Sequence, residues 1–388
     1  MNAKIFSRRR FVGGVAAALS CAAWPARRIL AQAMEPVVMS GSRRASTGEY
    51  ESLVKLCFNE NPYGPPESVM KAMTGALKYA NRYGYPDGGI VQAIAAHHGV
   101  AHANVLLGAG SSEILDIAGT ALLVGGKKVV GVEPTFGAVY EHAAGLKDDA
   151  IRLPLRADFR QDIPAIVKAV KDNHPNVGLV YLCNPNNPTG LIVTKEEVKE
   201  LLDGIPPEVP VLIDEAYHHF VEDPRYETSV PYVLAGRQVI VTRTFSKIAA
   251  LAGMRLGYGL APVTLMERLR PYADNLSVNA LAKWGGATAL QDAAALQRVR
   301  NDLLQTRKKT VSELEGLGYQ VLPSEANFFM VNLRRQARSV IQSFRERGIL
   351  VGRPFPPLLE HLRVSVGTPE EMSRFLDAFK EIMGGPKH

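Results

Sequence analysis

The sequence is poor in cysteine, in long apolar runs and in internal repeats. Three Cys among 388 residues cannot build the disulfide framework on which small secreted domains depend. The body of the chain has no apolar run of the roughly 18 residues that a membrane-spanning helix needs, and no segment recurs at the periods of solenoids or propellers. The composition, 46% apolar and 21% charged, excludes disordered, collagen-like and coiled-coil chains. At roughly 100–200 residues per domain, the length predicts two or three globular domains.

Acidic residues are absent from residues 1–33. The same segment carries six basic residues, which are Lys4, Arg8, Arg9, Arg10, Arg27 and Arg28. The rest of the chain has 39 basic and 38 acidic side chains, so nearly all of the formal charge of +7 belongs to this leader. Because the body has almost no basic excess, the sequence does not predict a nucleic-acid partner.

The leader has the parts of an export signal. Ser7-Arg8-Arg9-Arg10-Phe11 precedes an apolar stretch rich in Gly and Ala, and Ala31-Gln32-Ala33 has the small-x-small pattern of a cleavage site. The paired arginines resemble the twin-arginine signal. We expect residues 1–33 to be a signal peptide for the Tat export machinery, cleaved after Ala33, and the mature protein to be periplasmic or exported, with no stable membrane span. A basic tail that anchors the protein to a membrane or is merely disordered, and lipidation at Cys21, stay open as alternatives.

Short β-branched runs alternate with helical patterns in the middle of the chain. The runs are 128–132, 151–155, 178–183, 211–213, 239–242 and 256–260. Helical patterns alternate with them, for example at 113–123 before the first run and at 195–202 between the third and the fourth. Near-continuous apolar strands separated by helices predict an α/β fold with a mostly parallel central sheet flanked by helices.

The C-terminal part has a different pattern. A helix-rich stretch over about 263–317 precedes predicted strands at 319–322, 328–332, 348–351 and 361–366. We therefore expect a large domain over 81–262 and a smaller α+β domain over 263–388. The segment 34–80 is expected to be an N-terminal arm that joins the small domain.

Polar side chains follow several predicted strands, which is where open α/β sheets bind their ligands. They are Asn187, Asp214, Tyr217, Thr244, Ser246 and Lys247, and Arg255 comes eight residues after Lys247. Ser111 and Ser112 open a predicted helix. Taken singly, each has a simpler interpretation as a helix cap, a turn residue or a solvated surface group. Taken together, they supply an amine for an aldehyde, a carboxylate for a protonated pyridine nitrogen, donors for a phenolic oxygen, and hydroxyls, a helix N-terminus and an arginine for a phosphate. This is the set of groups that a pyridoxal phosphate site needs.

Eight strings in one order along the chain point to a family. They are N-E-N-P (59–62), N-R-Y-G-Y-P (81–86), G-S-S-E (110–113), P-T-F-G (134–137), N-P-T-G (187–190), D-E-A-Y (214–217), S-K (246–247) with L-A-G-M-R-L-G (251–257), and L-R-V-S-V-G-T (362–368). With these strings the sequence resembles the class I/II aminotransferases, and within them the histidinol-phosphate aminotransferase branch. The resemblance implies the fold type I PLP-transferase architecture, bound pyridoxal 5'-phosphate and a homodimer.

The resemblance also implies a role for each residue. Lys247 would be the catalytic residue that holds the cofactor aldehyde as a Schiff base and then shuttles the proton. Asp214 would pair with the ring nitrogen, and Asn187 and Tyr217 would bond the phenolic oxygen. The phosphate would be held by Ser111, Ser112, Thr244, Ser246 and Arg255, with Tyr85 reaching across from the neighbouring subunit.

Four further positions complete the expected site, with Arg363 as its substrate-carboxylate arginine. Phe136 would stack on one face of the cofactor ring, in place of the usual Tyr, and Ala216 would lie under the other face. Asn61 and Arg353 would join Arg363 in binding the substrate. No metal is expected, because the pairs His97-His98 and His218-His219 lack partners at ligand spacing.

The expected activity is transamination between an L-amino acid, or a histidinol-phosphate-like amine, and a 2-oxo acid by a ping-pong mechanism. Two alternatives stay open from the sequence. One is a PLP-dependent amino-acid decarboxylase of the same branch, which shares the Lys, Asp and Arg positions. The other is a non-catalytic exported binding protein that retains the fold.

Overall fold

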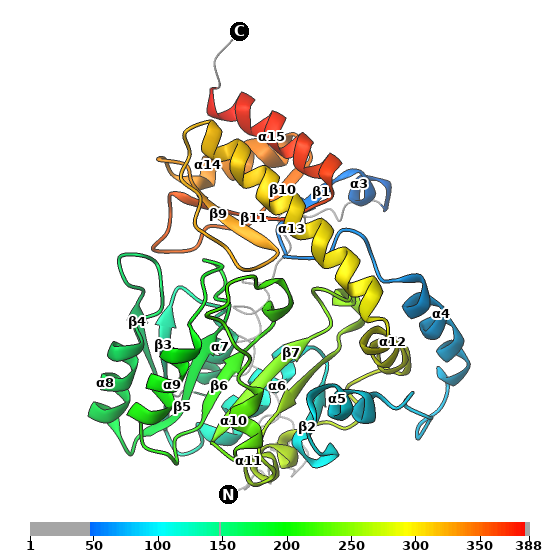
Figure 1. Ribbon diagram of the computed structural model, residues 1–388, viewed down its shortest axis with the longest axis vertical. Helices are drawn as coiled ribbons and strands as arrows, with labels where there is room; N and C mark the ends of the chain where they lie inside the picture. Colours follow the sequence, from blue (N-terminus) through cyan, green and yellow to red (C-terminus); the bar gives the residue numbers. More distant parts are fainter. Residues whose placement is uncertain (1–46, 147–148, 385–388) are drawn as a thin grey trace, which may run out of the picture. The chain divides into compact units, whose positions relative to one another are not determined.

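The computed structural model describes residues 47–146 and 149–384, which form two compact units that divide after Ser52 (Figure 1). In the first unit, the described part is the short helix α3 (Thr47–Ser52). The second unit begins at Leu53 and holds all other elements. The predicted signal peptide, its cleavage after Ala33 and the alternative at Cys21 lie outside the described residues. Within the described ranges, no helix is long and apolar enough to cross a membrane.

A seven-stranded sheet forms the centre of the second unit. Its order is β2 (Val105–Gly108), β8 (Gly257–Leu260), β7 (Val239–Thr244), β6 (Val211–Asp214), β5 (Val177–Cys183), β3 (Lys128–Glu133) and β4 (Ala150–Pro154). Strand β8 runs antiparallel to both of its neighbours, and every other pair is parallel. The predicted α/β architecture with a mostly parallel sheet is confirmed.

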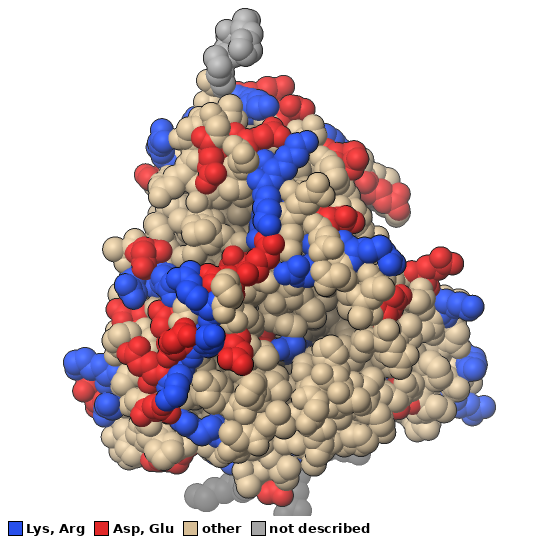
Figure 2. Space-filling view, in the orientation of Figure 1, with Lys and Arg blue, Asp and Glu red and all other residues tan. Residues whose placement is uncertain are grey.

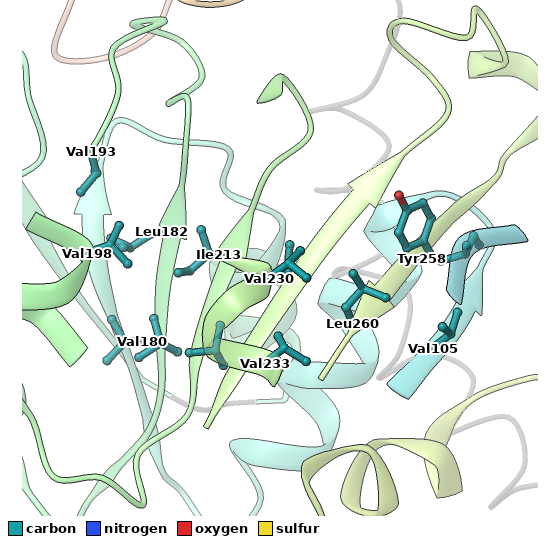
Figure 3. Close-up of a cluster of buried hydrophobic side chains, with 14 of the residues drawn as sticks. Val105, Val180, Leu182, Val193, Val198, Ile213, Val230, Val233, Tyr258 and Leu260 are labelled. Carbon is teal, nitrogen blue, oxygen red and sulfur yellow. The ribbon is translucent and has the colours of Figure 1, made fainter. Parts of the chain in front are cut away.

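The alternation of side chains along the strands explains why helices cover both faces of the sheet. On β5, Val180 and Leu182 belong to one buried cluster, while Leu179 and Tyr181 belong to another. The first cluster packs the sheet against α8 (Ile163–Asn173), α9 (Lys195–Gly204) and α10 (Val230–Leu234). Figure 3 shows part of it, with side chains of the strands beside those of α9 and α10. The second packs it against α6 (Ser111–Leu122), α7 (Ala138–Gly145) and α11 (Val263–Leu269). Burial on both faces makes the strands almost wholly apolar, as expected for a parallel sheet.

Two helices begin with the same local device. Thr194 precedes α9, its hydroxyl accepts the Glu197 N–H over 3.3 Å, and the Glu197 carboxylate accepts the Thr194 N–H over 2.8 Å. Thr368 and Glu371 repeat this capping box at the start of α15 (Pro369–Met383). Each box satisfies backbone donors that a helix start would otherwise leave unpaired.

Smaller sheets and longer helices make up the rest of the second unit. Strand β9 (Phe328–Asn332) pairs antiparallel with β11 (His361–Ser365), and β1 (Val54–Leu56) pairs parallel with β10 (Ile349–Val351). The remaining helices are α4 (Glu67–Ala76), α5 (Ile90–His98), α12 (Ala280–Gln291), α13 (Ala293–Gly316) and α14 (Ala337–Glu346). Buried phenylalanines of β9, α14 and α15 form the core around these small sheets. Strand β1 thus brings the N-terminal segment beside β10, while the expected domain boundaries stay a prediction.

The predicted strand at 319–322 is wrong. This segment makes only an isolated bridge between Val321 and Val331 of β9. Pro323 follows at once and has no N–H to donate, and Gly318 turns the chain with a φ of +84° at the other end. The ladder therefore cannot extend in either direction. The sequence analysis also missed β2, a short strand at the edge of the central sheet.

Charges of both signs are mixed over the face shown in Figure 2. Lys and Arg side chains alternate there with Asp and Glu, and an uncharged area lies over α5 and α11. This face carries no continuous basic stripe of the kind that binds nucleic acid.

A buried ion pair joins the ends of β6 and β7. Arg243 Nη2 donates to Glu215 Oε2 over 2.7 Å, and the two side chains are only 5% and 0% exposed. Thr228 Oγ1 and the Ser229 N–H also donate to the Glu215 carboxylate. The carboxylate therefore has several donors in a setting where an unpaired charge would be costly.

We predict that Glu215→Gln lowers the free energy of unfolding by about 3–5 kcal/mol, because it leaves the Arg243 charge buried without its counter-charge. Denaturation followed by tryptophan fluorescence measures the change. The matched control is Asp172→Asn, which breaks the exposed Lys168–Asp172 pair on α8 and should leave the midpoint unchanged. Equal small effects of the two variants would contradict the prediction.

Candidate active site

The strand register brings the expected site residues to one edge of the sheet. Cys183 at the end of β5 pairs with Asp214 at the end of β6, and Asp214 pairs with Thr242 of β7. The loops that follow these three parallel strands carry Asn187, Tyr217 and Lys247, so these side chains leave the sheet at the same carboxyl edge.

Lys247 is half-buried beside an aromatic ring. Its Nζ donates to the Phe58 carbonyl over 3.0 Å and lies 5.7 Å from the centre of the Tyr217 ring. Burial, helped by the positive charge of Arg363, lowers the pKa of Lys247 from 10.5 to about 8. A much larger fraction of this amine is therefore neutral, and so nucleophilic, at neutral pH than for an ordinary lysine.

Asp214 is buried, with 2% of its surface exposed. Thr242 Oγ1 donates to its Oδ1 over 3.0 Å. Burial raises the pKa of Asp214 from 3.8 to about 6, although the Thr242 hydrogen bond acts in the opposite direction. A carboxylate in so dry a position interacts strongly with any cation placed against it, because water screens the attraction little.

Two amide groups converge on the Tyr217 hydroxyl. Asn59 Nδ2 donates to it over 3.0 Å, and Asn187 Nδ2 donates over 3.4 Å. Burial raises the pKa of Tyr217, so the phenol stays protonated and keeps a hydrogen to donate.

Arg363 lies on β11 and is also buried, at 6% exposure. Its Nη1 donates to Asn187 Oδ1 over 2.6 Å, and its Nη2 donates to the Cys57 carbonyl over 2.5 Å. The guanidinium lies 4.8 Å from the Phe355 ring centre, and burial lowers the pKa of Arg363 to about 10. Its buried Nε has no hydrogen-bond partner, and each Nη makes one hydrogen bond of the two it can donate, so the guanidinium has N–H groups left for an anionic ligand.

The start of α6 and the Arg255 side chain form a cradle for an anion. Arg255 Nη2 donates to the Ala109 carbonyl over 3.3 Å, and Nη1 donates to Ala252. Gly110 adopts a φ of +81°, and a Cβ built on it would lie 2.3 Å from Arg255 Nη2. Only glycine allows the guanidinium to lie this close to a helix N-terminus, where backbone N–H groups attract negative charge.

Hydroxyl groups border the same cradle. Thr244 Oγ1 donates to Ser246 Oγ over 2.8 Å, and Thr244 pairs across the sheet with Gly257. A Cβ on Gly257 would lie 2.2 Å from the Ser111 backbone nitrogen. The structure therefore brings Thr244 and Ser246 beside the first turn of α6, which begins with Ser111 and Ser112.

The remaining expected residues have simpler surroundings. Phe136 is half-buried and packs against the cluster under α6 and α7, and Ala216 is buried between Asp214 and Tyr217 in the chain. The Tyr85 hydroxyl donates to the Val278 carbonyl over 3.0 Å.

Asn61 and Arg353 differ in how closely they approach Lys247. Asn61 Nδ2 donates to the carbonyl of Ile248, the residue after Lys247, over 2.9 Å. Arg353 is exposed, donates to the carbonyl of its neighbour Pro354 and stacks on Phe355, with 4.5 Å from its guanidinium carbon to the ring centre. Phe355 thus lies against both Arg353 and Arg363.

The sequence analysis missed two residues of this network. Thr242 supports Asp214 from the neighbouring strand, and Asn59 supports Tyr217 from the N-terminal segment. Thr242 was recognised only as the last residue of a strand, and Asn59 only as part of the N-E-N-P string. No local sequence pattern predicts either contact. The only available indication is that Asn is one of the few non-glycine residues that tolerate a positive φ.

One of the two histidine pairs contacts the buried ion pair, and the other contacts Tyr258. His218 Nε2 lies 2.8 Å from Arg243 Nη1, and His98 Nε2 lies 2.9 Å from the Tyr258 hydroxyl. Burial lowers the pKa of His218 well below its ordinary value. Among the residues that the structure describes, no group of three or more His, Cys, Asp or Glu could hold a metal ion.

The fold and this edge of the sheet define an enzyme-like site for a small cofactor that carries an aldehyde, a cationic ring and an anionic group. The model of the family "Aminotransferase class I and II" matches residues 51–379. The histidinol-phosphate aminotransferase of Moorella thermoacetica is 37% identical over 340 residues, which are 86% of each chain. The chain belongs to the class I and II aminotransferase family.

Solved structures agree with this assignment. The histidinol-phosphate aminotransferase of Sinorhizobium meliloti, solved with pyridoxal-5'-phosphate, superposes with a TM-score of 0.79 at 25% identity, over 90% of this chain and 97% of that one. The L-threonine-O-3-phosphate decarboxylase of Porphyromonas gingivalis has a TM-score of 0.73 at 22% identity, over 86% of this chain and all of that one, and shares the fold. The predicted fold type I architecture is confirmed.

We predict that Lys247 of the cofactor-free protein reacts with a small aldehyde and a hydride donor near neutral pH. With a pKa of about 8, about one Lys247 amine in ten is neutral at neutral pH, on the order of 300 times the fraction of a free lysine. Peptide mass spectrometry of the reductively methylated protein across the neutral to alkaline range should give a half-maximal rate near this pKa. The other lysines of the same digest are the internal reference.

Arg363→Gln should move that midpoint upward, because it removes a positive charge that disfavours the ammonium form. A midpoint at the ordinary lysine value in the wild type, or no movement in the variant, would show that burial and Arg363 do not control this amine.

Proposed function

We propose that the protein is a pyridoxal phosphate-dependent aminotransferase that moves an amino group between an L-amino acid, or a histidinol-phosphate-like amine, and a 2-oxo acid in a ping-pong reaction. Membership of the family supports this activity. The observation that carries it is the lowered pKa of the Lys247 amine. This amine lies beside Tyr217, at the same sheet edge as the buried carboxylate of Asp214.

The residues of the site fit this cofactor. The cradle at Gly110 and Arg255 would accept a phosphate dianion, together with the hydroxyls of Ser111, Ser112, Thr244 and Ser246. The dry carboxylate of Asp214 suits a protonated ring nitrogen, and the donors of Asn187 and Tyr217 suit a ring oxygen. Phe136 and Ala216 would lie against the two ring faces.

When bound, pyridoxal phosphate supplies an aldehyde carbon that takes up the amino group and a ring that accepts the electrons of the broken C–H bond. Lys247 Nζ would hold that aldehyde carbon until the substrate amine displaces it. The freed Nζ would then take the proton from the substrate carbon that bears the amino group and would deliver it to the former aldehyde carbon of the cofactor. A positioned base of this kind typically contributes about 10²–10⁴-fold in rate.

Substrate orientation is the proposed task of Arg363. Its planar guanidinium, held by Asn187 and the Cys57 carbonyl, would use its remaining N–H groups to bind a carboxylate or an equivalent anion. Arg353 and Asn61 would contact the more distant part of the substrate. A substrate panel that follows the absorbance change of the cofactor on amino transfer identifies the donor, with histidinol phosphate as its first member.

The two alternatives have less support. The decarboxylase shares the fold at 22% identity, whereas relatives named histidinol-phosphate aminotransferase reach 37%. A non-catalytic binding protein has no need of a lysine with a lowered pKa opposite a buried carboxylate. Release of CO₂ without turnover that depends on an oxo acid would favour the decarboxylase.

We also propose that two copies of the chain form the active unit. Tyr83, Leu276 and Leu77 expose 89%, 69% and 54% of their surfaces, and the Tyr85–Val278 hydrogen bond ties their two segments together. Ser277 Oγ in turn donates to Glu113 in the first turn of α6. A second copy on this apolar surface would bring its Tyr85 toward the phosphate cradle.

Sedimentation of the purified protein should give the mass of a dimer. Leu276→Glu should lower the measured mass toward that of one chain, because it places a charge on the apolar surface.

The export route is a further proposal, supported by the twin arginines and the small-x-small pattern of the leader. We expect the mature protein in the periplasm or outside the cell, with an N-terminus at Met34. N-terminal sequencing of the protein from the cell-envelope fraction tests this, and an intact Met1 there would contradict cleavage.

We predict that Lys247→Ala abolishes both the visible absorption of the bound cofactor and amino transfer, because it removes the amine that would hold the cofactor aldehyde. Lys308→Ala is the matched control, since Lys308 is exposed and pairs with Glu222 on the surface. Absorption spectra and transaminase assays of both variants decide the question. Unchanged colour and turnover in Lys247→Ala would refute the proposed function.

A further inference from the structure

Asn59 occupies an unusual position for a residue with no assigned role. It is 1% exposed, and its φ of +54° lies in the left-handed region that non-glycine residues seldom adopt. Such a conformation persists where the surroundings enforce it. It occurs here next to Phe58, whose carbonyl accepts the Lys247 hydrogen bond.

Every polar group of Asn59 has a partner. Its N–H donates to Ser365 Oγ over 2.8 Å, and its carbonyl accepts from Asn327 Nδ2 over 3.0 Å. In the side chain, Oδ1 accepts from Ser365 Oγ over 3.0 Å, and Nδ2 donates to the Tyr217 hydroxyl over 3.0 Å. The hydrogen bonds of Asn59 therefore connect the N-terminal segment both to β11 and to Tyr217.

The Asn59 amide lies with Oδ1 toward Ser365 and Nδ2 toward Tyr217. Ser365 Oγ accepts the Asn59 N–H and donates its own hydrogen to Oδ1. Nδ2 is then the end of the amide that faces the Tyr217 oxygen.

The consequence is a direction for the Tyr217 hydroxyl hydrogen. A phenolic oxygen accepts at most two hydrogen bonds and donates one. Here both acceptor directions receive amide N–H groups, from Asn59 and Asn187, so neither amide can take the phenolic hydrogen. That hydrogen is left to point away from both amides, toward whatever the site binds.

We propose that Asn59 is a positioning residue that keeps the Tyr217 hydroxyl as a donor to the bound cofactor's ring oxygen, an inference that rests on the proposed function. Without Asn59, the hydroxyl could rotate, and its hydrogen bond to the ring oxygen would weaken. A weaker bond stabilises the negative ring oxygen less, and the proton affinity of the neighbouring Lys247 nitrogen rises.

The test is a pH titration of the visible absorption of the cofactor-loaded enzyme. Asn59→Gly tolerates the positive φ and removes the amide donor. It should raise the pH midpoint by about 0.3–1 unit, the equivalent of one net hydrogen bond. Asn59→Asp has the same shape but replaces the donor by an acceptor that captures the phenolic hydrogen, so its midpoint should rise further.

The same substitution made in the Tyr217→Phe variant distinguishes positioning of the Tyr217 hydroxyl from a merely structural role of Asn59. In Tyr217→Phe the hydroxyl is gone, so adding Asn59→Gly should move the midpoint no further, even though it still removes the bonds to Ser365. Thermal unfolding of all four proteins in this cycle reports any loss of the N-terminal anchor separately.

No shift in Asn59→Gly, or equal shifts in the two backgrounds, would overturn the inference and assign Asn59 to anchoring alone. A wild-type protein that takes up no cofactor would instead refute the proposed function, and the inference with it.

Discussion

The backbone ladder that joins β5, β6 and β7 is the constraint on which the site depends. Because Cys183, Asp214 and Thr242 lie side by side in register, three loops leave the sheet at one edge. These loops carry the amide, the carboxylate and the amine of the site. A slip of one residue in this register would turn Asp214 to the opposite face of the sheet. Glu215, the residue after Asp214, forms the buried ion pair with Arg243 of β7, and the loss of this pair would add to the cost of such a slip.

Removal of water is the shared cause of the electrostatics at this edge. Burial lowers the pKa of Lys247 to about 8 and that of Arg363 to about 10, and it raises the pKa of Asp214 to about 6. All three shifts disfavour the charged form of the side chain. Without a ligand, each charge is therefore buried at a cost in free energy. A ligand that brings a cation to Asp214 and an anion to Arg363 relieves part of that penalty, which is why this donor set suits a zwitterionic substrate and a charged cofactor ring.

The N-terminal segment around Asn59 connects parts of the chain that are remote in sequence. Cys57 accepts from Arg363 across 306 positions, and Asn59 donates to Tyr217 across 158 positions. Both contacts run through a stretch that has no regular secondary structure. Hydrogen bonds to β11 and Asn327 hold this stretch in place, so the same few residues shape the surroundings of both Lys247 and Arg363.

The sequence by itself determined the architecture and the chemical types at the site. Strands such as 178–183 were readable because their apolar runs are local, and Lys247, Asp214 and Arg363 stood in recognisable strings. Only the tertiary structure decided that Thr242 supports Asp214, that Asn59 supports Tyr217 and that 319–322 makes one bridge instead of a strand. Those outcomes depend on partners far away in the chain, on a positive φ and on burial. A linear pattern carries none of these, because they exist only once distant segments have come together.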